Sequence, residues 1–228
     1  MNACQKKSVS CFACCGLANL DLNAATQRSI LQSRTQEFEA LDMDESRFRS
    51  FRLDREKKEE GIPRKNSEIY VCPFLGYLEP SRPGCMIHPA RTGNPMSQNY
   101  SFYGASICLS YDCPSKEKEE QSGISLYSDF LEAEFPEEYH RLICDSALFT
   151  LLETIPDFPD SVCSGDKKEV FRRFIGLRLH HPDAAHLTSF ERLMVRVSDK
   201  DQVIQELFLP GDQPEARDLL QTMKQKGP

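Results

Sequence analysis

The sequence predicts an α+β fold in two parts: a small cysteine-rich module with a helix and a short β-hairpin over residues 1–122, then a mainly helical half over residues 123–228. Two observations lead to this prediction. Eight of the ten cysteines fall before residue 114, where β-rich segments alternate with turn residues. Apolar residues at helical spacing dominate the stretch after residue 123.

The cysteines are densest at the start of the chain, where Cys4 is followed by the segment Cys11-Phe-Ala-Cys14-Cys15. Thiolates bind soft and borderline metal ions, and a Cys-x-x-Cys segment can bind one ion through both sulfurs. Adjacent Cys14 and Cys15 point in different directions in most backbone conformations. Cys15 is therefore expected to serve a second metal, to bridge two metals or to lie in the core. Residues 1–20 are predicted to form a turn-rich loop.

Residues 23–60 predict a helix with Asn23 as its N-cap and with Ile30, Leu31, Phe38 and Leu41 on one apolar face. The charged end of this segment is interpreted as a solvated helix face or a linker. Gly61 and Pro63 are typical of a helix end.

Residues 66–114 predict a β-hairpin followed by a long ordered loop. The strand Ile69–Leu78 would return through the turn Ser81-Arg-Pro-Gly84 to a second strand at Cys85–Pro89. This arrangement would bring Cys72 and Cys85 together across the hairpin. The loop over residues 91–105 leads to Cys108 and Cys113.

The second half begins after a polar linker at residues 115–122. Pro136 suits the first position of a helix, with Cys144 as a small buried residue inside it. Asp166 and Glu169 resemble a capping box for a helix with Phe171 and Phe174 facing inward. A strand at 192–198 and helices at 199–208 and 214–223 would follow.

Composition limits the classes of protein to which this chain can belong. A net charge of -7 and a pI near 5.3 argue against binding to a phosphate backbone. No apolar run approaches the length of a membrane span, and no secretory signal is visible. A cytoplasmic location follows as an expectation. There a dense cysteine set indicates metal binding, with redox or scattered structural thiols and a disulfide scaffold as alternatives.

The cysteine pattern resembles the YkgJ-type cysteine-cluster family, described as a zinc- or iron-chelating domain. The segment Cys11-x-x-Cys14-Cys15 resembles the family's CxxCC core. Cys72-x-Phe74-Leu75 resembles its second element, and Cys85-x-Ile87 with Arg91 its third. His88 and Thr92 stand where the family has Tyr and Pro, and Cys108 corresponds by order along the chain. The resemblance covers roughly residues 4–113 and implies metal binding without a general activity.

The sequence therefore predicts a metal-binding protein that chelates zinc or iron, with an iron–sulfur cluster as one form of the site. The alternatives are an enzyme that uses an iron–sulfur centre and a zinc-stapled interaction module whose C-terminal helices bind a protein partner. The partners expected are the metal ion and such a protein, with no nucleic acid and no membrane. His88 is a candidate ligand, or else a hydrogen-bonded loop residue. The predicted metal ligands are Cys11, Cys14, Cys15, Cys72, Cys85, Cys108, Cys113, Cys4 and His88.

Overall fold

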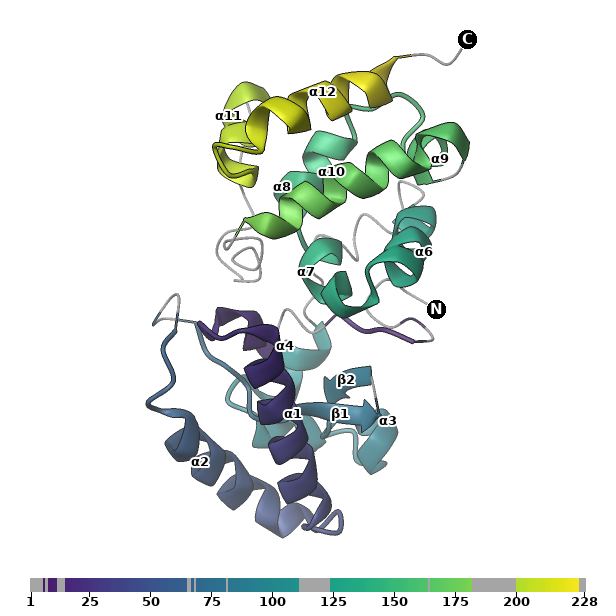
Figure 1. The fold of residues 1–228 in the computed structure, drawn as a ribbon. Coiled ribbons are helices and arrows are strands. Elements are labelled where there is room, and N and C mark those ends of the chain that lie inside the picture. Colours follow the sequence, from purple (N-terminus) through teal and green to yellow (C-terminus); the bar gives the residue numbers. More distant parts are fainter. Residues whose placement is uncertain are drawn as a thin grey trace.

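The computed structural model describes residues 6, 8–11, 15–64, 67, 69–80, 82–110, 124–163, 165–181 and 200–225 (Figure 1). These residues form eleven α-helices and one two-stranded antiparallel sheet, which agrees with the predicted α+β class. The linker at 115–122 and the predicted strand at 192–198 lie outside the described residues. No helix among those described is long and apolar enough to cross a membrane.

Two helices stand where the sequence predicts one. Helix α1 spans Ala24–Glu39, and Asn23 caps it as expected, because its Oδ1 accepts from the Thr26 backbone N–H at 2.9 Å. The chain then reverses through Asp42 and Met43, whose φ angles are 51° and 57°. Helix α2 spans Phe48–Glu59 after a short 3-10 turn. The predicted continuous helix over 23–60 is therefore wrong at this left-handed turn.

The hairpin is present, but its register differs from the prediction. Strand β1 spans Leu75–Glu79 and pairs antiparallel with β2, Arg82–Cys85, so that Leu75 lies opposite Cys85. The predicted turn residues Arg82, Pro83 and Gly84 belong to β2. Cys72 precedes β1 and does not pair with Cys85 in the sheet.

The predicted loop over 91–105 is helical for most of its length. Helix α3 spans Pro89–Thr92, the 3-10 helix η4 spans Ser97–Tyr100, and α4 spans Gly104–Ser110. Local polar groups build these turns. The Asn94 side chain accepts from the Met96 N–H at 2.8 Å, and the Asn99 side chain accepts from the Ala105 N–H at 2.8 Å.

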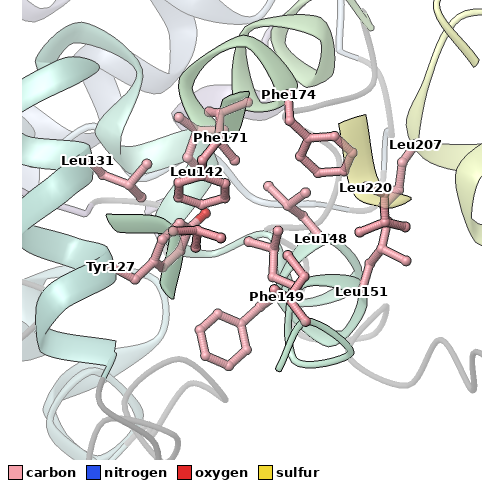
Figure 2. Packing of buried hydrophobic residues seen from close by; sticks show 14 of the residues in the cluster. Tyr127, Leu131, Leu142, Leu148, Phe149, Leu151, Phe171, Phe174, Leu207 and Leu220 are labelled. Atoms are coloured by element: carbon pink, nitrogen blue, oxygen red, sulfur yellow. The ribbon is translucent and has the colours of Figure 1, made fainter. Parts of the chain in front are cut away.

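The second half packs short helices around one hydrophobic cluster (Figures 1 and 2). The predicted helix after Pro136 is broken at Cys144, because Asp145 caps a new helix by accepting from the Leu148 N–H at 2.9 Å. The expected capping box at Asp166 is also absent. The N-cap position of α10 is Lys167, whose side chain makes no capping hydrogen bond. The elements are α6 (Ile124–Glu134), α7 (Tyr139–Ile143), α8 (Ser146–Leu152), α9 (Asp160–Cys163), α10 (Lys168–His180), α11 (Lys200–Leu207) and α12 (Gln213–Lys224).

The described residues before Phe12, which we call the N-terminal strap (6 and 8–11), lie against this second half (Figure 1). Val9 is buried in the helical cluster. The Lys6 ammonium lies 2.6 Å from the Asp129 carboxylate, and the Ser8 hydroxyl donates to Glu132 at 2.6 Å. The first half has its own two smaller clusters, built from residues 17–87.

Candidate metal centre

Cys72 is the most firmly held of the predicted ligands. Its side chain is buried in the aromatic cluster of Phe38, Phe48, Phe51 and Phe74. Its backbone N–H donates to the carbonyl oxygen of Cys15 at 2.9 Å. This bond brings the cysteine segment at the start of the chain against the hairpin, although the two positions are 57 residues apart along the sequence.

A buried arginine fixes the other side of Cys72. The Arg34 guanidinium has no exposed surface and donates to the Cys72 carbonyl oxygen at 3.1 Å. Both carboxylate oxygens of Glu59 accept from Arg34, and Arg55 contacts the same carboxylate. Burial opposes the ionisation of Glu59, but the two guanidinium groups outweigh burial and lower its pKa. The ion network therefore ties α1 and α2 to the backbone of a predicted ligand.

Cys85 and Cys108 contact side chains of one short helix and its C-cap. Gln98 lies in η4, and its Nε2 group donates to Cys85 Sγ at 3.8 Å. Ser101 is the C-cap of η4, and its hydroxyl lies 3.5 Å from Cys108 Sγ. Gln98 is 5% exposed, and its Oε1 atom has no hydrogen-bond partner among the described residues. Sequence reasoning missed both side chains, because they lie in the polar stretch that it treated as a loop.

A second contact of Ser101 determines the direction of the hydrogen bond between its hydroxyl and the Cys108 thiol. The Ser101 hydroxyl lies 2.7 Å from the Gln98 carbonyl oxygen, which can only accept. The hydroxyl therefore donates to that carbonyl, and the Cys108 thiol donates to the hydroxyl oxygen. The carbonyl also accepts from the Ser101 backbone N–H at 3.0 Å, so it keeps a partner if the hydroxyl turns toward a Cys108 thiolate.

Three of the predicted ligands influence one another electrostatically. Burial raises the pKa of the Cys72 thiol well above its ordinary value, and the nearby sulfurs of Cys85 and Cys108 raise it further. The charge of Arg34 opposes this rise. A positive ion among the sulfurs would reverse the repulsion between the thiolates.

Cys15 contacts both clusters of the first half. The residue after it, Gly16, has a φ of 73°, and a Cβ atom there would lie 2.2 Å from the carbonyl oxygen of Tyr70. Glycine is therefore required for the close approach of the two segments, on grounds of both conformation and space.

The remaining predicted ligands lie elsewhere. Cys11 packs against the helical cluster of the second half, and its Sγ donates to the His140 carbonyl oxygen at 4.0 Å. His88 caps α3 by accepting from the Ala90 N–H through Nδ1 at 3.1 Å, which leaves Nε2 as its atom for a metal. Cys4, Cys14 and Cys113 lie outside the described residues.

Within the described part of the chain, no three His, Cys, Asp or Glu side chains are grouped closely enough to hold a metal ion. Cys15 and Cys85 pack against the cluster that contains Cys72, and Cys108 acts on Cys72 by its charge. The chemistry of the donors fits a soft or borderline metal, and the Gln98 oxygen, which no described residue hydrogen-bonds, marks a polar position beside Cys85. A scan against protein-family models, a search of curated proteins and a search of solved structures each find no match to this chain.

Proposed function

We propose that this protein binds zinc or iron through a cysteine cluster built on Cys15, Cys72, Cys85 and Cys108. One observation carries the proposal: Cys72 is buried in an aromatic cluster against which Cys15 and Cys85 also pack, and Cys108 lies near enough to act on the Cys72 thiol by its charge.

Residues beyond the described ranges complete the proposed ligand set. Cys14 directly precedes Cys15, and Cys113 follows Cys108 by five positions. A tetrahedral site needs four donors, so these residues allow either one complete site with spare thiols or two sites. Cys11 stays a predicted ligand, but its contact with α7 favours Cys15, Cys72, Cys85 and Cys108 over it.

Metal analysis of protein purified without oxygen tests the proposal. We expect at least one zinc or iron ion per chain. An iron–sulfur cluster would also make the protein brown, with absorbance at about 400 nm, whereas zinc has no such band. Protein with reduced thiols that contains neither metal above background would contradict the proposal.

Two substitutions separate ligands from other cysteines. Cys85→Ser should remove most of the bound metal, because a hydroxyl is a far poorer ligand for these ions than a thiolate. Cys144→Ala in the helical half should leave the metal content unchanged, since Cys144 contacts the His140 and Arg141 carbonyls instead. The reverse pattern would show that the metal site has been assigned to the wrong half of the chain.

A further inference from the structure

A second pair of cysteines lies outside the proposed metal centre, at the contact between the N-terminal strap and α7. Cys144 Sγ donates to the His140 carbonyl oxygen at 2.9 Å. Cys11 Sγ approaches the same oxygen at 4.0 Å, although 133 residues separate the two cysteines along the chain. Since both sulfurs share one acceptor, the distance between them cannot exceed the sum of these two distances.

We infer that Cys11 and Cys144 form an oxidisable pair, and that a disulfide between them fastens the strap to α7. This inference goes beyond the proposed metal binding and does not depend on it. It assigns a covalent modification site to two residues of which the sequence predicts one as a metal ligand and the other as a core residue.

The surroundings hold both sulfurs in place. The strap is fixed on one side of Cys11 by Lys6–Asp129, by the Ser8–Glu132 hydrogen bonds and by the burial of Val9. Cys144 ends α7, directly before Asp145, whose carboxylate caps α8 and pairs with the buried Arg178 at 2.8 Å. A pair held by two separately anchored segments loses little freedom when a bond joins it.

The two sulfurs differ in access, which suggests the order of the reaction. Cys11 is partly exposed, whereas Cys144 is 9% exposed. The Cys11 thiolate would attack a sulfur of a small disulfide such as oxidised glutathione and expel one glutathione thiolate. The Cys144 thiolate would then attack Cys11 Sγ in the mixed disulfide and expel the second. Two protein thiols are oxidised and one glutathione disulfide is reduced to two thiols.

Rotation of the two side chains away from the His140 oxygen must precede bond formation, because a disulfide has its sulfurs about 2 Å apart. That rotation gives up weak S–H···O contacts. His140 is one of the last four residues of α7, and carbonyl oxygens at such positions commonly accept from groups other than the helix backbone.

Peptide mapping tests the inference on the full-length, reduced protein. The protein is treated with oxidised glutathione under native conditions, remaining thiols are alkylated, and the unfolded chain is cleaved with trypsin and chymotrypsin at neutral pH. Cleavage after Lys6 or Lys7 separates Cys11 from Cys4, and cleavage after Phe12 separates it from Cys14 and Cys15. Cleavage after Leu148 or Phe149 separates Cys144 from Cys163. We expect the peptide that contains Cys11 to be linked to the peptide that contains Cys144. The mass of the linked pair should be two hydrogens less than the sum of the two reduced peptides.

Three variants sharpen the test. Cys144→Ser should abolish the linked pair and leave Cys11 as a glutathione adduct. Cys163→Ser is the matched control, because Cys163 also packs against the helical cluster, and it should leave the Cys11–Cys144 link unchanged. Cys85→Ser should also leave the link unchanged, so a failure of the metal proposal can be told apart from a failure of this one. Links from Cys11 to Cys14 or Cys15 in place of Cys144, or glutathione adducts alone in the wild type, would overturn the inference.

Discussion

At the residue scale, Gln98 is a side chain without metal-binding character that would shape the proposed metal site. Its amide nitrogen donates to Cys85 Sγ, while its buried oxygen has no hydrogen-bond partner in the part of the chain that the structure describes. Groups that hydrogen-bond to ligands orient them and adjust their electron density, and their loss typically costs 10–100-fold in metal affinity.

We therefore expect Gln98→Leu to weaken zinc binding by roughly tenfold or more while the fold is kept. A competition titration against a chromogenic chelator measures the change. Gln36→Leu, on the exposed face of α1, is the matched control and should bind zinc as the wild type does. Equal affinities for the two variants would show that Gln98 does not act on the site.

Gly16 allows strain and steric clash to be separated. Gly16 and Gly93 have φ angles of 73° and 74°, but a Cβ atom at Gly93 would meet no atom within 4 Å. Gly93→Ala should therefore lower the free energy of unfolding only by the conformational strain, about 1 kcal/mol. Gly16→Ala should cost more, about 2–4 kcal/mol, since the Tyr70 backbone must also move. Urea denaturation measures the free energy of unfolding of both variants. Equal losses would show that the clash with Tyr70 does not contribute.

At the scale of the elements, local signals account for what the sequence predicts well. The Asn23 cap, the hairpin and the helices α11 and α12 follow from residues near one another in the chain. The break at Asp42 depends on two residues in left-handed conformation, which glycine usually supplies. The Arg34–Glu59 pair joins positions 25 residues apart, and no local pattern indicates it. The contacts of Cys85 with Gln98 and of Cys108 with Ser101 join positions 13 and 7 residues apart, and no pattern in this polar stretch indicates them.

The pairing of α1 with α2 depends on Glu59, which two buried arginines contact at once. Removal of one partner from a buried ion pair leaves an uncompensated charge and costs about 3–5 kcal/mol. We expect Glu59→Gln to lower the free energy of unfolding by about that amount. The exposed neighbour Glu60→Gln should have little effect. A loss for Glu59→Gln no larger than that for Glu60→Gln, in chemical denaturation, would contradict this role.

Helix α7 carries a buried histidine that makes the second half sensitive to acid. Burial lowers the pKa of His140 to about 3, and the Arg141 charge adds to the effect. The unfolded chain, with an ordinary pKa of about 6.5, binds this proton more readily than the folded one, so stability falls as the pH drops from about 6.5 toward 3.

The expected contribution is a loss of about 1–3 kcal/mol between pH 7 and pH 4.5 that His140→Gln removes. Denaturation of the wild type and the variant at both pH values measures this loss. The effect of the carboxylates cancels in the comparison, because both proteins contain them. An identical pH dependence in the two proteins would show that His140 does not titrate on unfolding.

At the scale of the whole molecule, the two halves differ in how much apolar core they bury. The described residues contribute 26 buried members to the cluster of the helical half, against 8 and 5 to the two clusters of the first half. The proposed ligands Cys15, Cys72, Cys85 and Cys108 all lie in the half with the smaller cores. A metal ion would join segments that few apolar contacts hold together. Structural zinc contributes on the order of 10–16 kcal/mol in small sites, which is comparable to the net stability of a domain.

Removal of metal should therefore loosen the first half before the second. With a strong chelator present, we expect trypsin to cut early at exposed Lys57 and Lys58 in α2, while the equally exposed Arg172 and Arg173 in α10 resist because their helix lies on the larger core. The N-terminal strap should stay with the helical half, since Lys6 and Val9 bind there and not to the cysteine region. Limited proteolysis with and without chelator, read by mass spectrometry, measures the order of cleavage. Equal protection of α2 in both states would mean that apolar packing and the Arg34–Glu59 network hold the first half together without a metal.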